Sequence, residues 1–231
     1  MAADKNQFTF LYPQLQEIDP KKWVSRWAAH YDGYDDDDYW RLIHKQGPLS
    51  YEDFELMGRW KDNAPKGSDK WKPNVAMVAY DVWMEAADKL RVCPERNDVA
   101  SFLSKWSEKK FRAGKGGPKS FGLARATTLL HFLSAGQYPI FDSRVIEAIG
   151  WLRGTETTNT VEAYLSCCPL LENIAEACGV SDAEGRRKLD KAMFAFGKWI
   201  SNNKEVVLTE EAELRRGSRE WPPTESQSIL K

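Results

Sequence analysis

The chain has 231 residues, of which 42% are apolar, with 33 Lys and Arg against 34 Asp and Glu. This size and apolar content suffice for one large domain or two small lobes around a buried core. The near-zero net charge excludes a uniformly basic nucleic-acid binder, so any DNA-binding surface must come from local segregation of charge. With a polar N-terminus and no apolar run of about 18 residues, the sequence predicts neither a signal peptide nor a membrane span.

The cysteines argue against a metal or cluster site. Cys93, Cys167, Cys168 and Cys178 lack both the spacing of zinc ligands and the four-Cys arrangement of an iron–sulfur cluster. We therefore expect no metal, no cofactor and a reducing, cytoplasmic location.

Helical periodicity dominates the first hundred residues. Trp23, Trp27 and Tyr31 recur at every fourth position of a predicted helix and share one face, and we place the two Trp residues in the core. Ser50, followed three residues later by Asp53, is a typical N-cap for another helix. The helix with Trp23, Trp27 and Tyr31 is predicted over residues 20–31, and further helices are predicted over residues 36–45, 74–90, 161–167, 170–178 and 182–202.

The predicted loop over residues 63–73 and the residues just before it contain both basic and aromatic side chains. The members of this group are Lys61, Lys66, Lys70, Lys72, Trp60 and Trp71. Such a mixture suits a loop that contacts a nucleic-acid strand, since bases stack on aromatic rings and Lys neutralises phosphate. A surface loop anchored by its Trp residues is an equally good interpretation.

The segment over residues 105–125 is strongly basic, with Glu108 as its single acid. It contains the end of a helix predicted over residues 99–111 and a turn at Ser120-Phe121-Gly122. A helix over residues 123–133 follows the turn. Its apolar residues recur at spacings of three and four and therefore share one face: Ala126, Leu129, Leu130 and Leu133.

An acid ends the segment after this helix. We expect Tyr138-Pro139-Ile140-Phe141 to be extended, because Pro139 disfavours helix in the residue before it. Asp142 then precedes a helix over residues 143–149, and Asp is a preferred N-cap.

The turn before residue 123 has the features of a phosphate-binding site. Backbone N–H groups at a helix N-terminus lack helical partners, and the helix dipole favours an anion there. The residues expected to contact a DNA backbone are Lys115, Lys119, Ser120, Gly122, Arg125, Ser143 and Arg144. For the basic charges alone, a solvated helix face is the alternative.

The turn, the helix and the Pro-containing segment ending in Asp together resemble the helix-hairpin-helix DNA glycosylases, which include 8-oxoguanine glycosylase and endonuclease III-like enzymes. In that superfamily the hairpin reads apolar-Gly-apolar-Gly, and an Ala follows the second Gly by four residues. Here Ser120 stands in place of the first Gly, Gly122 is the second, and Ala126 follows it by four. Ile140-Phe141-Asp142 is similar to the family's catalytic segment.

The resemblance implies a mainly α fold, a two-lobed helical bundle with a helix-hairpin-helix motif. Its divisions would be an N-terminal helical region contributing to a base pocket (residues 1–100), a glycosylase-like core (residues 101–202) and a C-terminal tail (residues 203–231). Asp142 would be catalytic, because a fixed carboxylate stabilises positive charge on the sugar or activates water. A plain N-cap is the alternative for Asp142, and the two roles are compatible.

Bifunctional members of the superfamily carry a Lys nucleophile two residues after the second hairpin Gly, where this chain has Ala124. Arg125 cannot replace it, because a guanidinium stays protonated. The resemblance therefore implies a monofunctional, monomeric enzyme that binds double-stranded DNA, removes a modified or damaged base and leaves an abasic site. Glucosylated hydroxymethylcytosine of phage DNA and oxidised purine are the two candidate bases.

A glycosylase holds its flipped base between side chains. The candidates for such a pocket are Trp60, Trp71, Trp83, Tyr34 and His131. Core packing remains the better interpretation for any single Trp, and a structural hydrogen bond for His131. Two other functions stay open: a non-catalytic DNA-binding module that uses the hairpin only for phosphate contact, and a helical protein-interaction adaptor.

Overall fold

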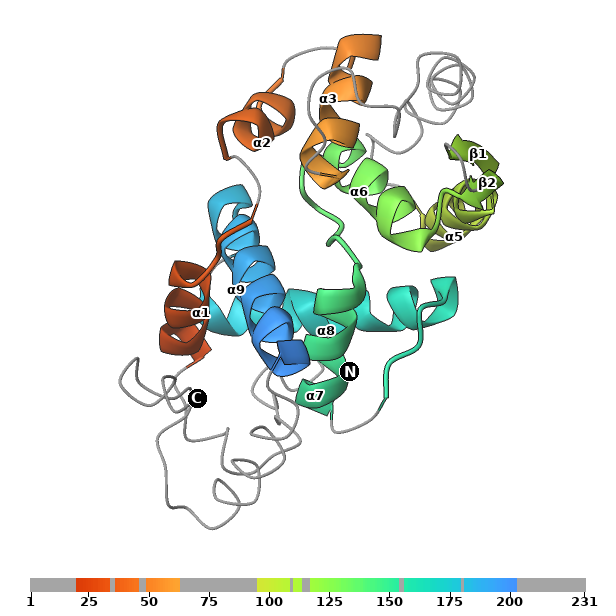
Figure 1. Ribbon diagram of the computed structural model, residues 1–231. Helices are drawn as coiled ribbons and strands as arrows, with labels where there is room; N and C mark the ends of the chain where they lie inside the picture. The colour runs from red at the N-terminus through yellow and green to blue at the C-terminus, as the bar shows by residue number, and fades with distance from the viewer. Residues whose placement is uncertain are drawn as a thin grey trace. The chain divides into compact units, whose positions relative to one another are not determined.

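The computed structural model describes residues 20–33, 36–45, 49–62, 95–108, 110–113, 117–153, 156–179 and 181–202, and only the backbone within 110–120. This part of the chain is mainly helical, as expected, and contains one pair of short strands (Figure 1). Several expected features lie outside the described residues: Tyr34, Trp71, Trp83, Lys115, the loop over residues 63–73, the helix over residues 74–90 and the tail over residues 203–231.

The elements are α1 (Pro20–Ala29), α2 (Asp36–Ile43), α3 (Tyr51–Asp62), α5 (Arg96–Ser107), β1 (Lys110–Ala113), β2 (Gly117–Ser120), α6 (Leu123–Leu133), α7 (Ser143–Arg153), α8 (Val161–Cys178) and α9 (Ala183–Asn202). Most agree with the predicted ranges to within about a turn. The two helices predicted on either side of Pro169 instead form one continuous α8. A proline removes one backbone donor, and here the helix continues through it.

The described elements fall into two compact units. One combines α1, α7, α9 and the part of α8 from Pro169 onward. The other combines α2, α3, α5, the strands, α6 and the part of α8 up to Cys168. Each unit takes segments from both halves of the sequence, so the grouping differs from the sequential division at residues 100 and 202 that the resemblance implied.

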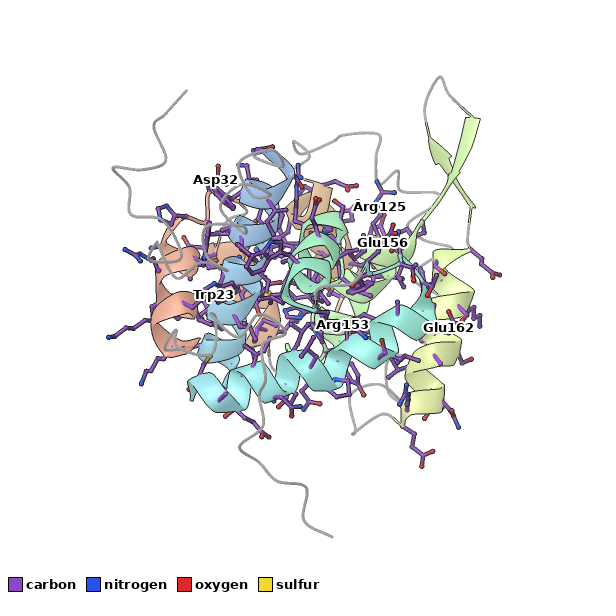
Figure 2. The ribbon with its side chains drawn as sticks, turned by 90° about the horizontal axis from the view of Figure 1, so that it is seen from below. Trp23, Asp32, Arg125, Arg153, Glu156 and Glu162 are labelled. Atoms are coloured by element: carbon purple, nitrogen blue, oxygen red, sulfur yellow. The ribbon has the colours of Figure 1, made fainter. Side chains whose placement is uncertain are left out.

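In the first unit, α9 packs against both α1 and α7. The rings of Trp23 and Trp27 lie 5.3 and 5.0 Å from that of Phe196 in α9, and Trp23 is marked in Figure 2. Both Trp residues are buried, which confirms their expected place in the core. On the α7 side, Gly197 permits a close crossing, since a Cβ there would lie 1.8 Å from the carbonyl oxygen of Arg144.

The core of the second unit includes α3, α5 and α6. The predicted apolar face of α6 is buried, with Ala126, Leu129, Leu130 and Leu133 all inaccessible or nearly so. Phe54, Met57 and Trp60 of α3 are buried as well. The predicted N-cap of α3 is confirmed: Asp53 N–H donates to Ser50 Oγ (3.3 Å), and Ser50 N–H donates to Asp53 Oδ2 (2.6 Å).

The connection between α5 and α6 differs from the expected tight turn. The helix predicted to reach residue 111 ends at Ser107, and β1 pairs antiparallel with β2 before α6 begins. The connection is rich in glycine and contains Pro118, and these residues disfavour helix. The N–H of Gly122 donates to the carbonyl of Ser107 at 3.1 Å. The ends of the two helices therefore meet at the base of the strand pair.

Candidate functional site

Gly122 is the N-cap residue of α6 and lies in the turn where the sequence predicts phosphate binding. Gly122 has φ +79°, a left-handed conformation that residues with a Cβ disfavour, so glycine suits this N-cap. Its carbonyl accepts the hydrogen bond of the Ala126 N–H at 3.1 Å. The N–H groups between these two residues point out of the helix end by the geometry of any α-helix. This end of α6 therefore has the donor arrangement that suits an anion.

Arg125, in the first turn of α6, is paired with an acid. Its Nη2 lies 3.1 Å from Oδ2 of Asp62, the last residue of α3. The Arg125 side chain, labelled in Figure 2, is 31% exposed. Asp62 thus offsets part of the charge of Arg125, while the guanidinium remains accessible to solvent.

A row of polar side chains on α6 holds the extended segment that follows the helix. Thr127 Oγ1 accepts a hydrogen bond from the N–H of Phe141 at 3.0 Å. Ser134 Oγ accepts one from the N–H of Tyr138 at 3.2 Å. His131 Nδ1 donates to the carbonyl of Tyr138 at 2.6 Å, since a carbonyl can only accept. The three side chains follow one another at spacings of four and three, so one helix face fixes the segment at both ends.

Asp142 follows this segment and directly precedes α7 in the chain. Its side chain is 12% exposed, and its Oδ2 accepts a hydrogen bond from Nζ of Lys61 at 2.8 Å. Lys61 lies in the last turn of α3, and its side chain is 8% exposed. The two groups form an ion pair that is largely shielded from water.

The role of Lys61 at this site is not anticipated by the sequence pattern, which groups it with the lysines of the following loop. The structure places it on α3, four residues after Met57 and seven after Phe54. Those spacings put Lys61 on the buried face of the helix. A Lys on an apolar helix face is the sequence signal for a paired amine, because Lys is almost never fully buried without a partner.

The last turn of α3 contacts two of the predicted site residues of the second unit. Lys61 pairs with Asp142, and neighbouring Asp62 pairs with Arg125. Trp60 packs into the core beside them. Three consecutive residues therefore fix α3 to α6 and to the segment that ends at the carboxylate.

Trp60 and His131, both candidates for a base pocket, lie in the core. The Trp60 ring is 5.2 Å from that of Phe132 and 5.8 Å from that of Tyr39. His131 is buried, and its Nε2 accepts a hydrogen bond from the hydroxyl of Tyr39 at 2.9 Å, because its Nδ1 carries the proton. His131 thus makes the structural hydrogen bond that was one of its two interpretations.

The remaining predicted DNA contacts within the described residues lie on two elements. Lys119 and Ser120 belong to β2, where only the backbone is described. Ser143 is exposed and begins α7, and Arg144 follows it half-buried. Two of the predicted site residues, Asp142 and Arg125, therefore contact the same helix, α3.

The shielded carboxylate of Asp142 is suited to two kinds of chemistry. As an anion it stabilises positive charge on a bound sugar, and as a base it activates a water molecule. A carboxylate with little hydration needs a counter-charge or hydrogen-bond donors, and Lys61 supplies both.

Across the described helices, none is both long enough and apolar enough to cross a membrane. The described His, Cys, Asp and Glu residues form no group of three that could hold a metal ion. In comparisons with known proteins, no family model, no curated protein and no solved structure matches the chain.

Proposed function

We propose that the chain is a monofunctional DNA N-glycosylase, which removes a modified or damaged base from double-stranded DNA and leaves an abasic site. The observation that carries the proposal is the Asp142 carboxylate, which is 12% exposed and follows a backbone segment anchored to α6. The resemblance of the hairpin and of the segment ending in Asp142 to the helix-hairpin-helix glycosylases supports the same assignment. The enzyme acts as a monomer in the cytoplasm.

The proposed reaction breaks the bond between the base and C1′ of its sugar. The base leaves with the bonding electron pair, and positive charge develops on C1′ and the ring oxygen. The Asp142 carboxylate stabilises this charge, and a water molecule adds to C1′ and gives up a proton, which the departing base takes. An electrostatic interaction of this kind is stronger at a site that solvent screens poorly. The products are the free base and an abasic sugar in an intact strand.

In the proposed complex, the start of α6 contacts the DNA backbone. Gly122 leaves the first N–H groups of the helix available to a phosphate, and Arg125 adds a partly accessible positive charge. Ala124 stands where the bifunctional members of the superfamily that the sequence resembles carry a nucleophilic Lys, so the proposed enzyme uses water and does not cut the strand. Glucosylated hydroxymethylcytosine and oxidised purine are the two substrate classes that we propose to test first.

A non-catalytic DNA-binding module is the second candidate function. The ion pair itself favours it, because Lys61 already neutralises the charge of Asp142. In such a module the pair would serve only to fix the extended segment that ends at Asp142 on α3. A loss of charge at Asp142 would then leave DNA binding intact and remove no activity.

A base-release assay distinguishes the two functions. Wild-type protein and Asp142→Asn are incubated with duplexes containing ordinary, oxidised, alkylated or glucosylated hydroxymethylcytosine bases, and strand breaks are scored with and without alkali. Alkali-dependent breaks on one substrate, lost in Asp142→Asn with DNA affinity unchanged, are the expected result. DNA binding without breaks on any substrate would contradict the enzyme and favour the binding module.

The matched control is Asp53→Asn. Asp53 is also a buried carboxylate of the second unit paired with a Lys, here Lys45, but it caps α3 at the end opposite Lys61. This variant tests whether the loss of a buried ion pair alone abolishes activity. It should retain base release at temperatures where it remains folded.

A further inference from the structure

The contact between Lys61 and Asp142 joins two elements that are 81 residues apart in the chain. The ammonium comes from the last turn of α3, and the carboxylate ends the extended segment that α6 anchors. Both side chains are at most 12% exposed, so neither is hydrated as it would be on the surface. The partner of each group therefore matters more than it would for an exposed pair.

The position of Lys61 is fixed by its neighbours on both sides. Trp60 is buried against Phe132 of α6, and Asp62 is paired with Arg125 of the same helix. The last turn of α3 is thus held on α6 immediately before and after Lys61. Its ammonium is delivered to the carboxylate by a rigid element rather than by a loop, which suits the precise placement of a reacting group.

We infer that Lys61 is a positioning residue for Asp142, which holds the carboxylate in a fixed orientation for base excision. This inference rests on the proposed glycosylase function. Without the ammonium, Asp142 Oδ2 loses the donor that joins it to α3. The direction of the carboxylate toward the sugar is then less closely fixed, and a misplaced catalytic group is a slower one.

Lys61 acts through Asp142 and not as a nucleophile. An ammonium that donates a hydrogen bond to a carboxylate has no lone pair with which to attack C1′. Lys61 thus differs in role from the Lys that bifunctional glycosylases use, and Ala124 remains consistent with an enzyme that leaves the strand intact.

Three variants test the inference under single-turnover conditions. Lys61→Met removes the charge but keeps much of the apolar stem, Lys61→Arg keeps the charge, and Lys45→Met removes a comparable Lys–Asp pair at the other end of α3. Lys61→Met should lower the rate of base release by about 10- to 100-fold, the cost of a misplaced catalytic group, with unchanged DNA affinity. Lys61→Arg should recover most of that loss, and Lys45→Met should release base at the wild-type rate.

Two results would overturn the inference. One is base release by folded Lys61→Met at the wild-type rate. The other is a covalent adduct of DNA on Lys61 after borohydride treatment, since it would make Lys61 the nucleophile. Should Lys61→Met fail to fold, Lys61→Gln removes the charge while keeping a hydrogen-bond donor, and it carries the same expected loss.

A measurement without DNA separates a failure of this inference from a failure of the proposed function. The ¹³Cγ resonance of Asp142 at pH 7 reports on the carboxyl group directly. It should change in Lys61→Met and remain unchanged in Lys45→Met. A changed resonance in a protein that releases no base would support the pairing and contradict the glycosylase, whereas an unchanged resonance would contradict the positioning role whatever the activity.

Discussion

The hydroxyl oxygen of Thr127 lies 3.0 Å from the backbone nitrogen of Phe141, so α6 holds the residue directly before Asp142. Phe141 is fully buried, and its N–H would lose this acceptor if the hydroxyl were removed. The placement of the proposed catalytic carboxylate therefore depends on a threonine in the interior of a helix, one turn before His131 makes its own contact with the same segment.

Thr127→Val should destabilise the second unit by about 1–3 kcal/mol, the cost of leaving a buried donor unsatisfied. Thr128→Val is the matched control, because Thr128 is equally buried and its hydroxyl donates only to the carbonyl of Ala124 within α6. Urea denaturation of both variants measures the difference. Equal losses of stability would show that the hydrogen bond to Phe141 contributes little.

Gly197→Ala should be strongly destabilising for the first unit. The added Cβ would lie 1.8 Å from the carbonyl oxygen of Arg144, a backbone atom that cannot rotate away. Overpacking of this kind costs about 1–3 kcal/mol or more, and here it also displaces the first turn of α7. Thermal unfolding measures the effect, with exposed Asn202→Ala on the same helix as the control. An unchanged melting temperature for Gly197→Ala would mean that α7 and α9 do not cross at this distance.

Local patterns in the sequence predict the helices of the structure well. The periodic apolar residues of α6 and α9 predict those helices almost to the residue, because a 3.6-residue repeat reports directly on the buried face. The position of Asp142 before α7 was likewise predictable, since Pro139 and a capping acid are local signals.

The partners of the site residues were not predictable in this way. Lys61 and Asp142 are 81 residues apart, and no local pattern indicates which distant residue a charged side chain pairs with. The strand pair between α5 and α6 was missed for a different reason: a basic, glycine-rich stretch is compatible with a loop, a helix end or a hairpin. The regular spacing of the polar residues Thr127, His131 and Ser134 is visible in the sequence. Their hydrogen-bond partners are not, because these belong to an extended segment that runs beside α6.

The capping box of α3 makes the stability of the second unit sensitive to acid. Burial by itself would raise the pKa of Asp53, but the hydrogen bonds from Lys45 and Ser50 outweigh it and lower the pKa below its ordinary value. A lowered pKa in the folded state means that the stabilisation is present above the unfolded value of about 3.9 and is lost as the pH falls through the folded value. Urea midpoints should therefore decrease from about pH 4 downward, and less so in Asp53→Asn. A parallel decrease in both proteins would assign the acid sensitivity to other groups.

Ser50→Ala tests the same box at neutral pH. It removes the hydroxyl that accepts from the Asp53 N–H and donates to the Asp53 carboxylate. The expected loss of stability is about 1 kcal/mol, typical of an N-cap Ser. Full retention of stability would show that the hydroxyl contributes little beside the contacts of Asp53 with Lys45 and with the backbone N–H of residue 50.

Cys168 should be nearly inert toward thiol reagents in the folded protein. Burial raises the pKa of its thiol to about 12, against a small opposing effect of the Tyr164 hydroxyl. Only the thiolate reacts, so at pH 8 labelling should be at least about 100-fold slower than that of free cysteine. Labelling followed by peptide mapping identifies the residue, and the same experiment in urea should restore the ordinary rate. Rapid modification of Cys168 without urea would mean that the start of α8 opens readily.

Substitutions of Arg125 and of its partner Asp62 should change DNA affinity in opposite directions. Arg125→Gln removes a proposed phosphate contact, so binding should weaken and the slope of log K against log salt should decrease in magnitude by about 1. Asp62→Asn removes the acid that offsets the same guanidinium, so binding should tighten, most clearly at low salt.

The matched control is Arg186→Gln, which breaks a surface pair with Glu172 in the first unit, outside the proposed contact surface. If Arg125→Gln and Arg186→Gln weaken binding equally, the effect follows net charge alone, and the start of α6 is not the phosphate site. If only the Arg125 and Asp62 variants respond, and in opposite directions, the phosphate lies within reach of that guanidinium, because Arg186→Gln lowers the net charge by as much as Arg125→Gln does.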